Sequence, residues 1–303
     1  MTGRPEFPVF KPIALEDRDF IQDIFDQYQP QTSELTFTNF FIWRLHYGIR
    51  WSTYGDWLFF LCDTDNDGSF AFQPIGPPPR LEVVGMLLQW LVENGKDPRI
   101  ERADQRLVSE IQQAGNLLIE PNRDHFDYVY RTEDLIHLTG NKYHSKRNHI
   151  SQFLRTNSFT YASLTDYLVK GCLELSETWC ELRRCEEDLN LLEEWEAVRQ
   201  ALSYFRSLKL EGGVILIGNK VEAFALGELL NQRTAVVHIE KANPEIPGLY
   251  ALINQQFCEK SWQSIPYVNR EEDLGEPGLR KAKLSYHPDH MAEKFRIRLA
   301  KGN

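Results

Sequence analysis

Residues 212–262, GGVILIGNKVEAFALGELLNQRTAVVHIEKANPEIPGLYALINQQFCEKSW, carry the clearest structural signal in the chain. Three apolar runs, 212–218, 221–230 and 234–242, are separated by turns of two or three residues, which predicts an antiparallel meander. A Pro/Gly loop then leads into a helix whose apolar face holds Leu249, Leu252, Ile253 and Phe257. Antiparallel strands followed by a strand, a loop and a helix predict an α+β fold.

The rest of the chain also alternates between helical and strand-like patterns. Helices are predicted over 14–28, 81–95, 103–114, 141–155 and 164–208, and strands over two hairpins within 50–76 and over 125–131. The composition changes at Glu133. We therefore predict two α+β domains, with limits at 1–135 and 136–303.

Length and composition place the chain among globular proteins. It has 303 residues, 42% of them hydrophobic and 12% aromatic, which excludes a disordered chain. It has no run of 18 apolar residues, and its first residues lack the apolar core of a signal peptide, so we expect a soluble, cytoplasmic protein. Five cysteines without a C-x-x-C pair predict no disulfide framework, and we expect Cys172, Cys180 and Cys185 to be packing thiols.

The net charge of −10 speaks against broad nucleic-acid affinity, but the charge is uneven. Residues 171–200 are acidic, whereas 140–155 and 278–303 are basic. On the predicted helix over 141–155, Lys142, Lys146 and His149 share one face, with Arg147 beside them. This face either binds phosphate or RNA, or pairs with the acidic helix.

No metal site is predicted. Residues 63–68, DTDNDG, match the first half of an EF-hand loop, but Pro74 stands where the bidentate Glu is required, so a solvated hairpin turn is expected. His287 and His290 flank a proline that breaks helical ligand spacing. The dinucleotide, P-loop, nucleophile-elbow and zincin motifs are absent from the sequence.

Two polar loops are candidate binding sites. The loop 244–250 joins a strand to a helix, where free backbone N–H groups hold phosphate, or it is an ordinary turn. Residues 269–286 follow a strand-like run and are expected to form a charged loop, which either binds an anionic donor through Arg280, Lys281 and Lys283 or is simply solvated.

Four segments carry a resemblance to a known family. SELTFTNFFIW at 33–43, GNKYHSKRNHISQF at 140–153, HIEKANPEIPGLYALINQQF at 238–257 and above all VNREEDLGEPGLRKAKLSYHP at 268–288 resemble the bacterial DUF2156 family. That family is similar to the C-terminal domain of phosphatidylglycerol lysyltransferases. The resemblance implies a tandem pair of GNAT-like domains, each a mixed, mostly antiparallel sheet flanked by helices.

The resemblance also implies a function. Related enzymes move amino acids from aminoacyl-tRNA onto lipids or peptidoglycan precursors, so this chain is expected to be an acyltransferase or aminoacyltransferase. Its donor would be aminoacyl-tRNA or a CoA thioester, with no covalently bound cofactor, and its acceptor the amine or hydroxyl of a small molecule, lipid or peptide. The alternatives are a non-catalytic binding or regulatory protein on the same scaffold, or a tRNA-binding module without transfer activity.

Site residues follow as a hypothesis. Glu240 or Glu228 would orient or deprotonate the acceptor, and Lys241 and Arg270 would meet negative charge. The remaining predicted contacts are, for the donor and its phosphates, Pro247, Gly248, Leu249, Tyr250, Lys142, Lys146 and Arg147, and, for the substrate, Asn269, Arg270, Asp273, Lys281, Lys283 and Tyr286.

Overall fold

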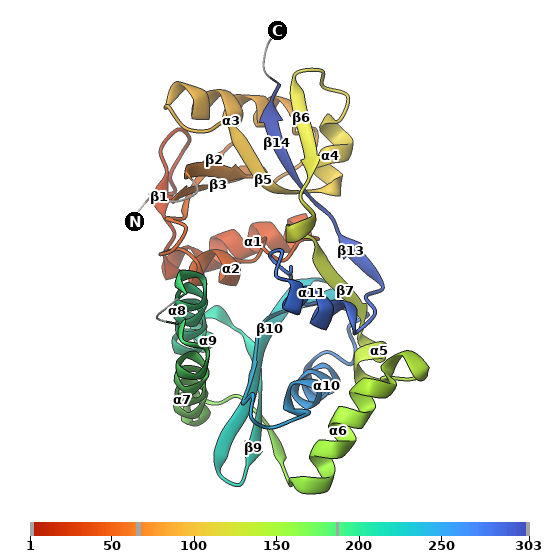
Figure 1. Cartoon of the computed structure of the whole chain (residues 1–303). Helices are drawn as coiled ribbons and strands as arrows, with labels where there is room; N and C mark the ends of the chain where they lie inside the picture. Colours follow the sequence, from red (N-terminus) through yellow and green to blue (C-terminus); the bar gives the residue numbers. More distant parts are fainter. Residues whose placement is uncertain (1–2, 65–67, 186–187, 301–303) are drawn as a thin grey trace. The chain divides into compact units, whose positions relative to one another are not determined.

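The computed structural model describes residues 3–64, 68–185 and 188–300, and these form two compact units, each built on a seven-stranded sheet (Figure 1). The first unit holds the described residues up to Asp127, then Glu272–Pro277, then the described residues from Met291 onward. The second holds Tyr128–Glu271 and Gly278–His290.

These limits differ from 1–135 and 136–303 because the last strand returns to the first sheet. β14 (Lys294–Leu299) pairs antiparallel with both β5 (Arg99–Asp104) and β6 (Leu117–Pro121) and lies between them. The first unit is therefore made of segments that are far apart in the sequence.

The first sheet has the order β1-β2-β3-β4-β5-β14-β6. Its pairs are antiparallel except for β4 with β5, which is parallel. Its other strands are β1 (Lys11–Pro12), β2 (Arg50–Tyr54), β3 (Trp57–Thr64) and β4 (Gly68–Phe72). Its helices are η1 (Leu15–Asp17), α1 (Arg18–Tyr28), α2 (Phe37–Ile42), α3 (Leu81–Glu93), α4 (Gln105–Ile111) and η2 (Arg123–His125). Residues 65–67 of the predicted hairpin turn lie outside the described residues.

Alternation along β3 builds a core on both faces of this sheet. Phe59 packs into the cluster formed with α3 and α4, which includes Leu87 and Leu107. Its neighbour Phe60 faces the other way and stacks on Phe40 of α2, with ring centroids 3.9 Å apart. Helices thus cover both faces of the first sheet.

The second sheet has the order β13-β7-β12-β11-β10-β9-β8. The meander predicted over 212–242 is confirmed as β9 (Glu211–Ile217), β10 (Lys220–Asn231) and β11 (Thr234–Ala242). The other strands are β7 (Asp127–Arg131), β8 (Thr160–Ser163), β12 (Tyr267–Asn269) and β13 (His290–Ala292). β11 and β12 are parallel, whereas the pairs β7–β12 and β8–β9 are antiparallel.

Two groups of helices cover the two faces of this sheet (Figure 1). α7 (Asp166–Arg183) lies on one face, where Gly171 comes so close that an added Cβ would be 2.6 Å from Val221 Cγ2. α10 (Leu249–Ser261) lies on the other face. The remaining helices are α5 (Thr132–His137), η3 (Asn141–Tyr143), α6 (His144–Thr156), α8 (Leu189–Ser203), α9 (Phe205–Leu208) and α11 (Pro277–Leu284).

α11 corrects the expectation that 269–286 is a loop throughout. The helix begins at Pro277, whose fixed φ and missing N–H suit the first helical position, and it carries Lys281 and Lys283. None of the helices in the described part of the chain has the length and apolar composition needed to cross a bilayer.

Candidate active site

The candidate site lies where β11 extends beyond its partner β12. The two parallel strands pair only at 234–236 with 267–269, and β11 continues to Ala242. Because side chains alternate along a strand, Glu240 and Lys241 point to opposite faces. Glu240 faces α10, and the chain that follows β12 brings Arg270 to it.

Glu240 is held by two side chains. Arg270 Nη2 donates to Glu240 Oε1 at 3.0 Å, and Asn254 Nδ2 of α10 donates to Oε2 at 3.0 Å. Burial alone would lower the pKa of the Arg270 guanidinium, but Glu240 raises it above its ordinary value. The site therefore contains a partly buried, charged pair in which each carboxylate oxygen retains a second lone pair.

Two polar atoms beside Glu240 are left open. Arg270 Nη1 and Asn254 Oδ1 are buried and have no hydrogen-bond partner within the described residues. Burying an unpaired donor or acceptor costs about 1–3 kcal/mol. A hydrogen-bond donor and an acceptor, both next to one carboxylate, are thus available to a ligand.

Tyr286 brings a second cation to this site. Its ring centroid is 4.8 Å from the Arg270 guanidinium carbon and 3.9 Å from Lys146 Nζ. Burial and the repulsion from Arg270 lower the pKa of Lys146 to about 8. Lys146 is consequently charged at neutral pH but loses its proton at a lower pH than an exposed lysine does.

Lys146 also lines a pocket of about 540 Å³. The pocket lies within the second unit, between the start of α6 and α11, and its lining contains no carboxylate. The lining residues are Lys142, Ser145, Lys146, Gly278, Lys281, Ala282, Ser285 and His287.

A second polar cluster is centred on His238. The register of β10 against β11 shifts between Leu226 and Gly227, which leaves His238 as the extra residue of a bulge. Glu228 Oε1 lies 3.0 Å from its Nε2, and Glu271 Oε1 lies 2.8 Å from its Nδ1. Burial opposes the charged ring, but the two carboxylates outweigh it and raise the pKa of His238 to about 10.

The structure thus separates the three residues predicted as catalytic. Glu240 pairs with Arg270, whereas Glu228 pairs with His238. Lys241 lies on the face covered by α7 and α8, with its ammonium group 2.7 Å from Glu194 and 3.3 Å from the centroid of the Trp179 ring. Burial lowers the pKa of Lys241.

The predicted donor loop is tightly packed. Gly248 has a φ of +89° and lies against α6, where an added Cβ would be 2.2 Å from the His149 carbonyl oxygen. Leu249 is buried, and the Tyr250 hydroxyl accepts a hydrogen bond from Trp179. Pro247 stands directly before Gly248, so this stretch as a whole supports the start of α10.

The two basic segments converge, but only some of their residues are available. Lys142, Lys146 and Lys281 line the same pocket. Arg147 instead donates to the carbonyl oxygens of Leu138 and Gly140, at 2.7 Å for the latter. Lys283 Nζ donates to the Arg270 carbonyl oxygen at 2.6 Å.

Asn269 and Asp273 orient backbone. The buried Asn269 Oδ1 accepts from the Glu271 N–H, which fixes the turn that presents Glu271 to His238. Asp273 belongs to the first unit, where it accepts from the Gly275 N–H and lies 3.3 Å from Arg123. Asn269 therefore positions the chain at the predicted site, whereas these contacts of Asp273 lie within the first unit.

Asn254 and His238 were absent from the predicted residues. Asn254 adjoins the apolar face of the predicted helix at 249–257, so a polar residue at a buried helical position was a usable signal. His238 becomes prominent only through the bulge, which the sequence pattern does not show.

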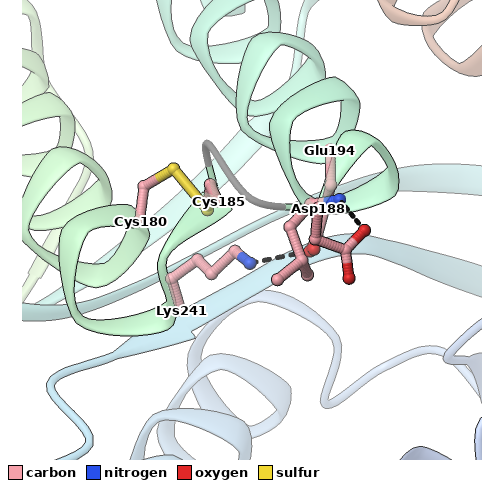
Figure 2. Close-up of a disulfide and its surroundings, with 6 residues drawn as sticks. Cys180, Cys185, Asp188, Glu194 and Lys241 are labelled. Atoms are coloured by element: carbon pink, nitrogen blue, oxygen red, sulfur yellow. Dashed lines mark hydrogen bonds and ion pairs between the residues drawn. A yellow bond between two sulfur atoms is a disulfide. The ribbon is translucent and has the colours of Figure 1, made fainter.

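The region around Lys241 also corrects the expectation for the cysteines. Cys180 and Cys185 form a disulfide, whereas Cys62, Cys172 and Cys258 are free and buried. Arg184 ends α7 in the left-handed conformation and turns the chain back, which brings the two sulfur atoms together. Figure 2 shows this disulfide and the Lys241 side chain bonded to Glu194.

The first unit contains a cluster that could attract a cation. Carboxylate oxygens of Glu34, Asp127 and Glu272 lie close enough together to hold a metal ion. Lys294 Nζ contacts all three, at 2.6 Å from Asp127 and 3.2 Å from Glu272. The chain therefore supplies its own positive charge to this cluster.

Comparisons with known proteins agree on one family. The family model of the phosphatidylglycerol lysyltransferase C-terminal domain matches residues 25–298. A conserved Bacteroides thetaiotaomicron protein of unknown function is 32% identical, with a TM-score of 0.90 over 96% of this chain and 99% of that chain. The DUF2156 C-terminal domain of an Agrobacterium fabrum protein described as a lysylphosphatidylglycerol synthetase is 16% identical, with a TM-score of 0.65 over 95% and 92%.

Two more distant structures establish the fold class. A tandem GNAT protein from the clavulanic acid biosynthesis pathway has a TM-score of 0.51 at 10% identity, over 97% of this chain and 99% of that chain. FemX has a TM-score of 0.56 at 9% identity, over 96% and 97%. The chain is accordingly a tandem of GNAT-like domains, as predicted.

One curated relative matches part of the chain. The uncharacterized protein MYCGA3080 of Mycoplasmoides gallisepticum is 20% identical in an alignment of 186 residues that covers 57% of this chain. The matched part spans 56% of that relative.

Proposed function

This chain belongs to the family of the phosphatidylglycerol lysyltransferase C-terminal domain, and we propose that it transfers an aminoacyl or acyl group from an activated donor to an amine or hydroxyl acceptor. The donor is an aminoacyl-tRNA ester or a CoA thioester. Both present a carbonyl carbon to the acceptor, so the same catalytic groups serve either one.

One observation carries the proposal, namely the open donor and the open acceptor beside Glu240. Arg270 Nη1 is suited to donate to the carbonyl oxygen, which becomes negative as the acceptor attacks. Asn254 Oδ1 is suited to accept from the attacking amine or hydroxyl. These are the two complementary contacts that an acyl-transfer reaction requires.

Glu240 transfers the acceptor's proton to the leaving group. A bond forms between the acceptor nitrogen or oxygen and the carbonyl carbon, and the ester C–O or thioester C–S bond breaks. The acceptor's proton passes to Glu240 and from there to the leaving oxygen or sulfur. No covalent enzyme intermediate is needed, because positioning and charge supply the catalysis.

The experiment tests whether the whole chain consumes an aminoacyl-tRNA donor or an acyl-CoA donor. A pool of aminoacyl-tRNAs and a pool of acyl-CoAs are each incubated with amines, peptides and phosphatidylglycerol vesicles, and loss of the acyl ester or release of CoA is followed. We expect one pool to be consumed. Glu240→Gln and Arg270→Gln should each slow that consumption about 100-fold, the usual effect of removing one group that stabilises the transition state.

Glu259→Gln is the matched control, because Glu259 is a partly exposed carboxylate on the same helix as Asn254. It should leave the rate unchanged. If a folded protein consumes neither pool, the non-catalytic binding role takes precedence. If Glu240→Gln retains the full rate, Glu240 does not carry the proton.

A further inference from the structure

The three-lysine pocket, defined by Lys142, Lys146 and Lys281, adjoins the Glu240 site through Lys146, which packs on the Tyr286 ring. Lys142 comes from η3 and Lys146 from the first turn of α6, whereas Lys281 comes from α11, 135 residues further along the chain than Lys146. The fold thus brings together two basic segments that no local pattern connects.

The positive charge in this pocket is poorly balanced. Lys142 has a distant partner, Asp134, at 3.4 Å, and it is mostly exposed. The ammonium groups of Lys146 and Lys281 form no ion pair with any residue that the structure describes. Three cations around about 540 Å³ with no lining carboxylate produce a field that attracts anions.

Lys146 is the least solvated of the three. It is partly buried and packs on the Tyr286 ring, which Arg270 also contacts. This position costs the ammonium group hydration, and the attraction of Glu240 compensates only part of that loss. An anion in the pocket would compensate the rest.

We propose that the three-lysine pocket binds the phosphate group of a phosphate ester. The pocket is large enough for a nucleotide, and its lining includes Ser145, Ser285 and His287 beside the three lysines. Lysine ammonium groups commonly bind phosphate, which they attract as point charges. Phosphate binding is inferred from the lysines alone. Only the identity of the molecule that carries the phosphate rests on the proposed function.

The proposal has a consequence for protons. The groups that face Lys146 are Arg270, Glu240 and Tyr286 on one side and Lys142, Lys281 and His287 in the pocket. Since most of these are cationic or neutral, the free pocket releases the Lys146 proton at a pH of about 8. A bound phosphate favours the charged form, so binding takes up a proton above that pH.

The experiment measures the affinity of the full chain for three soluble probes by calorimetry: inorganic phosphate, adenosine 5′-monophosphate and glycerophosphoglycerol. At pH 7.5 and at pH 9, adenosine 5′-monophosphate is mainly dianionic and glycerophosphoglycerol is monoanionic, so for these two probes a change in affinity reports on the protein. We expect binding to weaken about tenfold at pH 9, which corresponds to uptake of about one proton. Lys146→Ala and Lys281→Ala should each weaken it at least tenfold at pH 7.5.

Two variants keep the result interpretable. Lys146→Arg should retain binding but lose the pH dependence, because a guanidinium stays charged at pH 9 and also stacks on tyrosine. Lys170→Ala, at an exposed lysine on α7, should behave as the parent protein. The melting temperature of each variant reports whether it is folded.

Each outcome decides the proposal. Binding of adenosine 5′-monophosphate assigns the pocket to a nucleotide phosphate, and binding of glycerophosphoglycerol assigns it to a headgroup phosphodiester. Absence of binding at 10 mM of every probe, or affinity that the lysine variants leave unchanged, overturns the site. The transfer assay is independent: it can succeed when phosphate binding fails, and fail when phosphate binding succeeds.

Discussion

His238 carries a charge in the interior of the second unit. Each ring nitrogen faces a carboxylate, so both must donate, and the ring is therefore an imidazolium. It joins β10, β11 and the chain that follows β12 through Glu228 and Glu271. We call Glu228, His238 and Glu271 together the histidine clamp. This clamp keeps residues 270–271 against β11 and thereby holds Arg270 near Glu240.

We expect this charge to make stability fall as the pH rises. The pKa of His238 is raised to about 10 in the folded chain, whereas an unfolded histidine has a pKa of about 6.5. The contribution is complete below pH 6.5 and is lost as the pH rises toward 10. The free energy of unfolding, measured with urea at pH 7, 8 and 9, should fall by up to about 1.4 kcal/mol per pH unit.

His238→Gln supplies the comparison, because glutamine is neutral and its amide reaches one carboxylate only. Its stability should depend less on pH over the same range. The ring protons of His238, followed by NMR, should show the charged form at pH 9. A neutral ring at pH 8 would contradict the clamp.

At this scale the sequence predicts charged residues better than their partners. Glu240 and Arg270 are identified because they lie in 238–257 and 268–288, two of the segments that carry the family resemblance. Asn254 and Tyr286 complete the site through contacts that depend on how α10 and α11 pack, and a single sequence does not determine that packing.

Among the elements, α7 ends in a disulfide, here called the α7 staple, which ties its last turn to the chain that follows. The disulfide links Cys180, in the last turn of α7, to Cys185 just beyond it. Nearby, Trp179 and Glu194 of the two helices hold Lys241 of β11. The staple thus restrains the end of a helix that packs on the second sheet.

Reduction should destabilise this part of the chain. A closed loop of this length restricts the unfolded chain by about 2 kcal/mol, by the entropy model. A phosphine reductant should therefore lower the melting temperature by a few degrees. The double variant Cys180→Ser/Cys185→Ser should melt at the lower temperature with or without reductant, and a parent protein insensitive to reductant would contradict the staple.

Element types were largely predictable, because turns of two or three residues between apolar runs define β9, β10 and β11 with little ambiguity. The disulfide was not, since it depends on the left-handed conformation of one residue, Arg184. α11 was missed because its charged residues hid a short helix that starts at Pro277.

For the whole molecule, the lysine at the centre of the first unit joins distant parts of the chain. Lys294 of β14 contacts Glu34, Asp127 and Glu272, and all four side chains are mostly or fully buried. Burial raises the pKa of Glu34 to about 8, with Lys294 opposing that shift. Glu272 keeps a pKa well below its usual range despite burial, because Lys294 and its neighbours stabilise its charge.

Lys294→Met should cost about 3–5 kcal/mol of unfolding free energy, because it removes the cation that contacts all three carboxylates. The deficit should be smaller at pH 5 than at pH 8, since the carboxylates take up protons more readily at the lower pH. Chemical denaturation at both values measures it. Adding Glu34→Gln should restore part of the loss, and equal deficits at the two pH values would contradict this role for Lys294.

β14 also determines when the first sheet can be completed during synthesis. The sheet is interrupted between β5 and β6 until a strand near residue 294 arrives, after the second unit's meander has been made. During synthesis on the ribosome, the edges of β5 and β6 that pair with β14 therefore stay unpaired until most of the remaining chain has emerged. A nascent chain stalled before β14 leaves the tunnel would be the form most exposed to chaperones, and the N-terminal half expressed alone would lack a central strand.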